Sequence, residues 1–151
     1  MYPFVLGAHN IFRWIVLIAG VLAAGRALIG WFGKKEWTKQ DRLFGMVFTS
    51  SVDIQLLLGI LLYFVFSSWG LAAILDKGMS FVMGQSEYRF FGIEHALYMI
   101  LALVFAHLGS ALPKKVDDSL SKHKRAAIWF SLSLLLILAG IPWWRPLLPS
   151  I

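Results

Sequence analysis

The sequence predicts an all-α protein, a transmembrane antiparallel four-helix bundle. Composition carries this prediction, because 59% of the 151 residues are hydrophobic, only 15% are charged, and the mean hydropathy is +0.73. A soluble domain has about 25% charged residues, so the polar surface that a water-exposed globule needs is missing. The length suffices for about four spans of roughly 20 residues joined by short connections.

Four apolar stretches, separated by segments that carry charges, are the predicted spans. A segment in contact with lipid must satisfy its own backbone hydrogen bonds, and no stretch shows the alternation of a strand, so each is predicted to be helical. The spans cover about residues 4–32, 43–67, 90–112 and 122–142 of a single membrane domain.

Local signals indicate where these helices begin. The first apolar stretch lacks a basic leader and is too long for a cleaved signal, so it is expected to remain as a span. Asp41 is the expected N-cap of the second helix, and Ser86 is expected to open the third. Asp117 or Asp118 is expected to cap the fourth helix.

The connection from Trp69 to Glu87 is the one long loop between predicted spans. Its residues 71–75 and 81–83 are apolar, and Asp76-Lys77-Gly78 interrupts them. Three interpretations stay open: an interfacial helix on the outer leaflet, a lid over the end of the bundle, or a loop with an apolar side.

The basic residues predict the orientation of the chain in the membrane. Nine of the 14 lysine and arginine residues lie in two breaks, 34–42 and 113–125. Because positive charge marks the cytoplasmic side, both termini and the long middle loop are predicted to face outward. This topology also accounts for the net charge of +6, so no nucleic-acid partner is expected.

The four histidines form two pairs at matching depths. His9 and His95 each lie a few residues inside helices that enter from the outer face, so their rings are expected near the outer boundary. His107 and His123 lie eight residues on either side of Lys115, which places both near the inner boundary if the last two helices form a hairpin. The alternative is that each histidine is a hydrogen-bonded packing residue, or, for His123, a solvated interfacial one.

Two histidine pairs in a helical bundle are typical of haem ligation. The third helix can supply one ligand to each of two stacked sites, because His95 and His107 are 12 residues apart, about 18 Å along the axis. Neutral imidazoles that face each other across a bundle are usual ligands of six-coordinate haem b. The predicted cofactor is therefore one or two haem b groups, with the four histidines as ligands of the haem iron. Bare zinc or copper is disfavoured, because each pair supplies only two nitrogens and the chain has no cysteine.

Charged side chains within the spans need a partner, because an unpaired charge at the bilayer centre costs about 2.5 to 3.5 kcal/mol. Arg13 lies one turn from His9 and is expected to neutralise a haem propionate or to pair with Asp53. Asp53 can orient a ligand histidine, pair with Arg26 or Arg13, or take part in proton movement. A structural ion pair between Asp53 and one of these arginines is the preferred interpretation. No residue is predicted to be catalytic, since no nucleophile turn and no pair of acids is evident.

Six short motifs resemble those of small four-helix bacterial membrane proteins filed as cytochrome B-like. They occupy residues 9–14, 53–59, 94–95, 106–109, 122–124 and 140–143, which read HNIFRW, DIQLLLG, EH, AHLG, KHK and GIPW. The resemblance covers the whole chain. It implies a haem b electron carrier of the bacterial inner membrane that passes electrons between a quinone pool and a redox partner protein.

The resulting hypothesis is a membrane b-type cytochrome-like electron-transfer protein, an electron carrier or subunit rather than a stand-alone enzyme. The alternative is a cofactor-free accessory or scaffold subunit of a membrane complex, whose histidines and charges hold the helices together. The sequence leaves open whether the chain works alone, as a homo-oligomer or within a larger complex.

Overall fold

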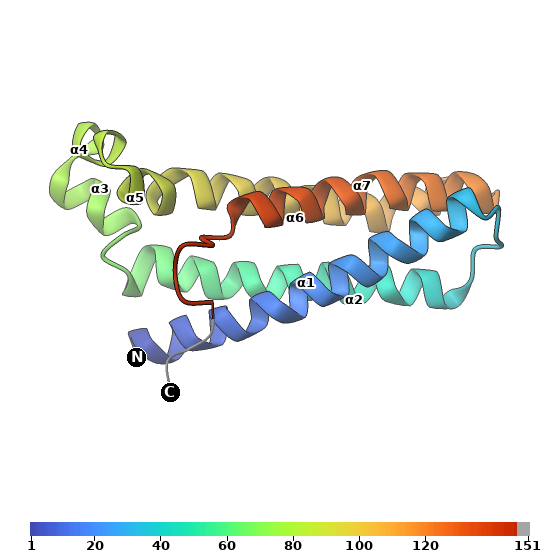
Figure 1. The fold of residues 1–151 in the computed structure, drawn as a ribbon, viewed down its shortest axis with the longest axis horizontal. Helices are drawn as coiled ribbons and strands as arrows, with labels where there is room; N and C mark the ends of the chain where they lie inside the picture. Colours follow the sequence, from blue (N-terminus) through green and yellow to red (C-terminus); the bar gives the residue numbers. More distant parts are fainter. Residues whose placement is uncertain (148–151) are drawn as a thin grey trace.

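The computed structural model describes residues 1–147, and all regular secondary structure in that part of the chain is helical. Four long helices lie side by side along one axis (Figure 1). They are α1 (Tyr2–Phe32), α2 (Lys39–Leu61), α6 (His95–Ala111) and α7 (Ser119–Gly140). Short helical segments extend or connect them: η1 (Leu62–Phe66), α3 (Leu71–Lys77), α4 (Met79–Gly84), α5 (Ser86–Arg89), η2 (Phe90–Glu94) and η3 (Leu112–Lys115).

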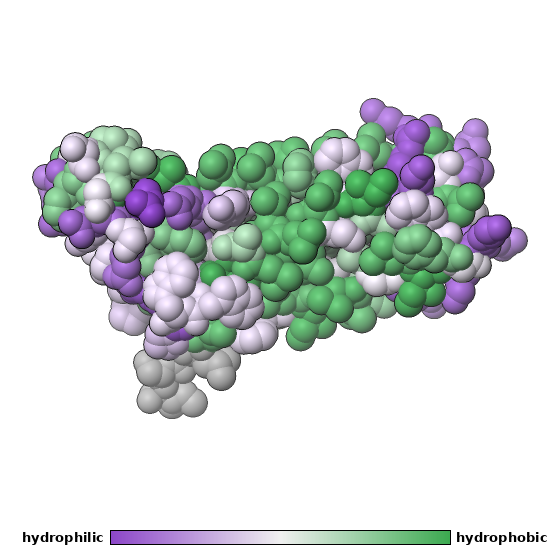
Figure 2. Space-filling view, turned by 45° about the horizontal axis from the view of Figure 1, so that its top comes forward, coloured by the Kyte–Doolittle hydropathy of each residue, from purple (hydrophilic) through white to green (hydrophobic). Residues whose placement is uncertain are grey.

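Four helical stretches of the described chain are long and apolar enough to cross a membrane. They are Tyr2–Phe32, Lys39–Lys77, Ser86–Lys115 and Ser119–Gly140. The view in Figure 2 shows apolar side chains over the middle of the molecule and hydrophilic side chains gathered at both ends. The all-helical prediction and the number of long apolar helices are therefore confirmed, and membrane insertion remains a prediction.

The second helix begins earlier than predicted, and its N-cap is Thr38 rather than Asp41. Thr38 has extended backbone angles, and the Asp41 carboxylate accepts hydrogen bonds from the Thr38 N–H at 2.8 Å and from its hydroxyl at 2.6 Å. An acid at the third helical position reaches back to the residue that precedes the helix, which is one half of a capping box. The prediction of Asp41 as the N-cap is therefore wrong: Asp41 is the third residue of the helix, and its side chain bonds to the N-cap residue.

The predicted starts of the third and fourth helical stretches agree with the structure. Ser86 opens α5, which continues through η2 into α6. Asp118 is the N-cap of α7 and accepts a hydrogen bond from the Ser121 N–H at 2.8 Å. That backbone hydrogen bond favours the ionised carboxylate and lowers the pKa of Asp118.

The helices form a closed ring of neighbours. Helix α1 packs against α2 and α7, and α6 packs against the same two helices, so α1 and α6 face each other diagonally. Helix α1 is inclined to the others, and the segment 141–147 runs from the end of α7 across to α1 (Figure 1). The N-terminus and α3 to α5 lie at this end, and the connections 33–38 and 112–118 lie at the other.

The long middle connection folds into two short helices. Gly78 separates α3 from α4 and has a φ of +82°, a left-handed conformation that glycine adopts without strain. Two side chains of this segment, those of Ala73 and Val82, are buried. The connection is therefore ordered helix rather than open loop, and its contact with a membrane surface stays a prediction.

Two phenylalanine rings form the centre of the bundle. Phe48 of α2 and Phe130 of α7 are fully buried, and their ring centroids lie 5.6 Å apart at 77°. A Cβ added to Gly20 would lie 2.9 Å from the Phe48 ring, and one added to Gly109 would lie 2.5 Å from the Phe130 ring. Gly20 of α1 and Gly109 of α6 thus serve helix packing, because the absence of a side chain lets an aromatic ring lie directly against the backbone.

Replacing Gly109 with alanine tests this packing. The added methyl group requires the buried Phe130 ring to move, and we expect overpacking to cost about 1–3 kcal/mol and to lower the apparent melting temperature. The matched control is Gly25→Ala in α1, where nothing lies within 4 Å of the added Cβ and helix propensity favours alanine by up to about 1 kcal/mol. Thermal unfolding followed by circular dichroism in mild detergent compares the two, and equal behaviour would contradict the packing described.

Candidate cofactor site between α1 and α6

Two histidines meet across the diagonal of the bundle. His9 lies in the third turn of α1, and His95 is the first residue of α6, directly after the π-helical turn η2. Their ring centroids are 6.2 Å apart, with an angle of 63° between the ring planes. The structure therefore brings together the two histidines that were predicted to share the outer depth.

The orientation of His95 is fixed by the end of α7. Its Nδ1 lies 2.7 Å from the carbonyl oxygen of Gly140, the last residue of that helix. A carbonyl can only accept, so Nδ1 carries the proton and Nε2 keeps a free lone pair. A second hydrogen bond of this kind is what usually orients a metal-ligating imidazole.

Unpartnered buried polar atoms gather around His9. Five buried side-chain polar atoms in residues 1–147 have no hydrogen-bond partner, and three of them are His9 Nδ1, Arg13 Nε and Gln55 Oε1. The other end of the Gln55 amide donates to the backbone carbonyl of His9 at 3.0 Å, which places Gln55 in the same cluster. Most buried polar groups in proteins are paired, so such a cluster marks a candidate place for water or a bound group to complete the hydrogen bonding.

Arg13 is a charged side chain that is buried beside the pair. It is 7% exposed and lies one turn along α1 from His9. Its guanidinium donates to the backbone carbonyl of Leu147 and, at 3.5 Å, to the side-chain oxygen of Asn10. Both acceptors are neutral. Within residues 1–147 the positive charge of Arg13 therefore has no anionic hydrogen-bond partner.

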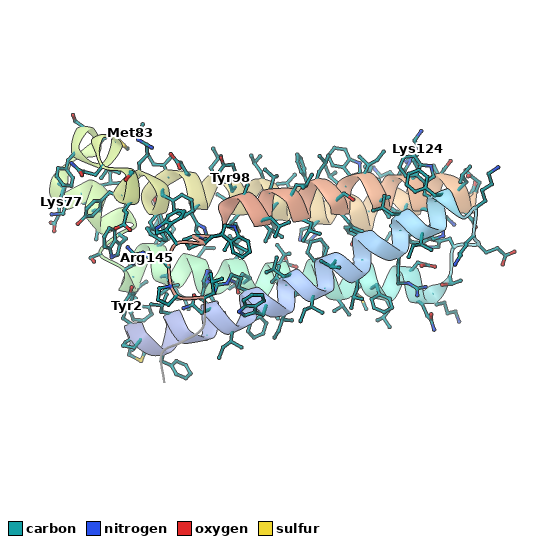
Figure 3. The ribbon with its side chains drawn as sticks, in the orientation of Figure 1. Tyr2, Lys77, Met83, Tyr98, Lys124 and Arg145 are labelled. Carbon is teal, nitrogen blue, oxygen red and sulfur yellow. The ribbon has the colours of Figure 1, made fainter. Side chains whose placement is uncertain are left out.

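The segment 141–147 closes the end of the bundle at this site. The Arg145 guanidinium lies between the rings of Trp69 and Phe91, at 4.8 and 4.9 Å from their centroids, and donates to Glu87 at 3.2 Å. Figure 3 shows Arg145 toward the end that carries Lys77 and Tyr2, with Lys124 at the opposite end. Sequence reasoning did not identify this segment as part of the site, although Pro142 marks the end of α7 and leaves the Gly140 carbonyl free for His95.

The other two histidines do not meet. His107 Nε2 lies 2.8 Å from Asp53 Oδ1, on α2. His123 is 1% exposed, stacks edge-on against Trp37 at 4.9 Å, and lies where a Cβ on Gly30 would be only 2.2 Å from its ring. The two side chains contact different helices, so the expected inner pair is not assembled. The contacts of His123 favour the packing interpretation.

The expected ion pair of Asp53 with an arginine is also not formed. Arg26 pairs with Asp41, with its Nε and Nη2 at 3.1 and 3.0 Å from one carboxylate oxygen. Depth explains the difference: Arg26 lies near the end of α1, level with the first turn of α2, and Asp53 lies 12 residues, about 18 Å, farther along. Asp53 is left to pair with His107.

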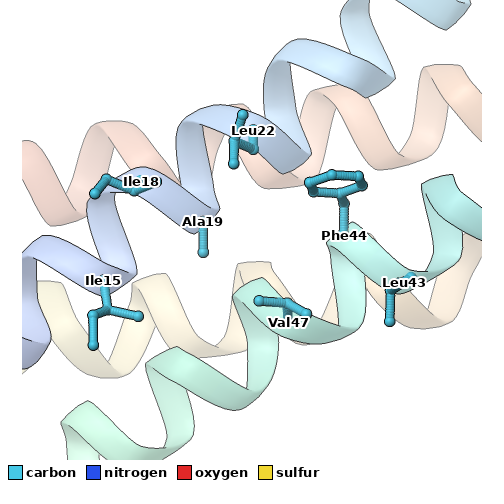
Figure 4. A pocket seen from close by; sticks show the side chains of 7 residues that line it. All are labelled: Ile15, Ile18, Ala19, Leu22, Leu43, Phe44 and Val47. Carbon is cyan, nitrogen blue, oxygen red and sulfur yellow. The ribbon is translucent and has the colours of Figure 1, made fainter.

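Two hollows of the described surface lie away from the His9–His95 pair. One is a shallow groove between α1 and α2, shown in Figure 4, which is lined by Ile15, Ile18, Ala19, Leu22, Leu43, Phe44 and Val47. All of its lining residues are apolar, so it offers no ligand to a metal or to an anion. The other lies beside His123 near Arg26 and Asp41.

Within residues 1–147, no group of three or more histidine, aspartate or glutamate side chains is placed to hold a metal ion. Comparisons with models of protein families, with curated proteins and with solved structures found no match to this chain. The arguments for function therefore rest on the geometry of the His9–His95 pair.

The tautomers of His95 and His107 provide a direct test of this geometry. His95 donates through Nδ1 to a carbonyl, and we expect the Nδ1–H form, whereas Nε2 of His107 donates to a carboxylate, which requires a proton on Nε2. Nitrogen NMR of histidine-labelled protein without cofactor, assigned with single His→Gln variants, distinguishes the two forms. A proton on Nε2 alone in His95 would contradict the orientation described.

Proposed function

We propose that this chain is an integral membrane protein, an antiparallel four-helix bundle, that binds one b-type haem between His9 and His95 and carries electrons. The observation that carries the proposal is the diagonal histidine pair, with ring centroids 6.2 Å apart and His95 oriented by Gly140. A haem b supplies a one-electron couple at its iron when it is bound.

The spacing of the pair fits two ligands of one iron. With a metal–nitrogen distance of about 2.0 Å on each side, the centres of two opposed imidazole rings lie about 6 Å apart. The Nε2 lone pair of His95 is free for this role, because its Nδ1 is engaged by Gly140. The rings of Phe90 and Phe91 lie 5.8 and 6.3 Å from the His95 ring and give this side of the site an apolar wall.

Arg13 fits the carboxylate groups of such a cofactor. Its guanidinium is buried one turn from His9, and within residues 1–147 its Nε has no hydrogen-bond partner. A buried cation without an anion is costly at membrane depth, and a propionate would neutralise it through charge-assisted hydrogen bonds. The three unpartnered polar atoms around His9 support the same interpretation.

The contacts of His107 and His123 favour one haem over two. Each of these side chains has its own protein partners, on α2 and at the 33–38 connection respectively. A second pair of ligands would require both to leave these contacts. The proposal therefore assigns a single cofactor to the outer end.

The charge distribution supports a membrane orientation with both termini outside, and the family resemblance implies the inner membrane of a bacterium. The basic connections around residues 33–38 and 112–118 lie at one end of the molecule, and the N-terminus and α3 to α5 lie at the other. The His9–His95 pair is then near the outer surface. A quinone and a redox partner protein, which the family resemblance implies, are the proposed electron partners.

The visible spectrum tests the proposal. Protein purified in mild detergent after haem supplementation should show a Soret band and, with dithionite, a reduced α-band. His9→Ala and His95→Ala should each remove these bands or shift them away from those of a six-coordinate haem, because either change leaves the iron with one imidazole ligand instead of two. His107→Ala is the matched control and should keep these bands. Absence of both bands in the unaltered protein would instead favour a cofactor-free scaffold subunit.

The role of Arg13 is tested by charge. Removing a buried cation near the iron favours the oxidised form, so Arg13→Met should lower the midpoint potential, by an amount on the order of tens of millivolts. Arg13→Lys keeps the charge and should change the potential less. Redox titration of the absorbance measures both variants, and an unchanged potential in Arg13→Met would remove Arg13 from the site.

A further inference from the structure

The pair formed by His107 and Asp53 lies outside the proposed haem site. It joins α6 to α2 through one hydrogen bond of 2.8 Å, and the two side chains are 52% and 45% exposed. An exposed acid–base pair is ordinary on a protein that faces water. This one lies on the outer surface of two apolar helices.

The pair lies deep within the stretches that are apolar enough to span a membrane. Asp53 is 14 residues from Lys39, about 21 Å along α2, and His107 is eight residues from Lys115, about 12 Å along the chain. In a membrane, neither side chain would reach the layer of lipid headgroups at the basic end. Both would face hydrocarbon if lipid covered this surface.

The hydrogen bonding of the pair is incomplete. Within residues 1–147, Asp53 Oδ2 and His107 Nδ1 have no protein partner, since the one bond joins Oδ1 to Nε2. Acyl chains offer neither donors nor acceptors, so an unsatisfied polar group that faces them is costly. Polar side chains at membrane depth usually face protein or a water-filled cavity instead.

Apolar side chains continue this surface along both helices. They recur at helical spacing from the pair and are all exposed: Leu57 and Ile60 on α2, Phe64 on η1, which continues α2, and Val104, Ile100 and Leu97 on α6. The surface is thus a two-helix apolar face that contains one acid and one base. We name it the α2–α6 face.

We propose that the α2–α6 face binds a second copy of this chain around a two-fold axis. In such an interface the same patch meets itself, so residue i of one copy contacts residue j of the other, and j contacts i. A patch with an acid beside a base is self-complementary under this operation. With both ring nitrogens of His107 protonated, Nε2 donates to Asp53 Oδ1 of the same copy and Nδ1 donates to Asp53 Oδ2 of the other copy, so both unsatisfied atoms acquire partners.

Membrane insertion is the only part of the proposed function on which this inference rests. The haem is not needed, because the His9–His95 site is formed by α1 and α6 within one copy. Coverage of the same face by lipid alone, or by a different membrane protein, would be visible as a different outcome of the experiment below.

The chain has no cysteine, so single-cysteine variants report contacts directly. Leu57→Cys places a thiol one turn from Asp53 on the α2–α6 face, and Leu135→Cys places one on α7 with matched exposure, 61% against 62%. After oxidation in native membranes, we expect a disulfide-linked dimer of this chain from Leu57→Cys and at least several-fold less from Leu135→Cys. Equal yields, no dimer, or a crosslink to a different protein would each overturn the proposal.

The polar pair is tested in the Leu57→Cys background. Asp53→Leu or His107→Leu should lower the dimer yield several-fold, and the exchanged pair Asp53→His with His107→Asp should restore it, because a swapped patch is still self-complementary. Failure of both single variants to change the yield would show that the pair does not hold the interface. Resistance of the protein to carbonate extraction and its haem spectrum, recorded on the same membranes, separate failure of this interface from failure of insertion or of haem binding.

Discussion

The close approach of four helices around two phenylalanine rings is the constraint on which the rest of the structure depends. Phe48 and Phe130 are buried against each other, and glycines on α1 and α6 let their rings lie directly on backbone. An aromatic ring on a bare helix surface fixes both the separation and the rotation of the two helices. The fixed separation and rotation of the helices then determine which partners the more distant side chains contact.

Because of that rotation, the polar side chains at the two ends of the bundle make different contacts. At one end, His123 fills the space above Gly30, and Arg26 holds Asp41 at the start of α2. At the other end, α1 is inclined to its neighbours, and the segment 141–147 runs from α7 to α1, where the Leu147 carbonyl accepts from Arg13 and Trp14. Three of the five unpartnered buried polar atoms in residues 1–147 lie at this end, which is where the cofactor is proposed to bind.

Sequence reasoning predicted the candidate site in part. Depth along a helix follows from counting residues, so the match of His9 with His95 was predictable. The same count also matched His107 with His123, which the structure separates, because depth says nothing about which neighbour a side chain faces. The roles of Gly140 and Leu147 were not predictable, since both act through backbone carbonyls, which every residue type has.

The sequence by itself determined the all-helical class, four helices of membrane-spanning length and the position of the basic ends. These properties are local, because hydropathy, capping residues and helix length depend on neighbours in the chain. Only the tertiary structure decided that α1 and α6 lie diagonally across the bundle and that α2 and α6 share one outward face. It also decided that Asp53 is hydrogen-bonded to His107 rather than to an arginine. Those outcomes depend on how whole helices rotate and pack, which no single segment specifies.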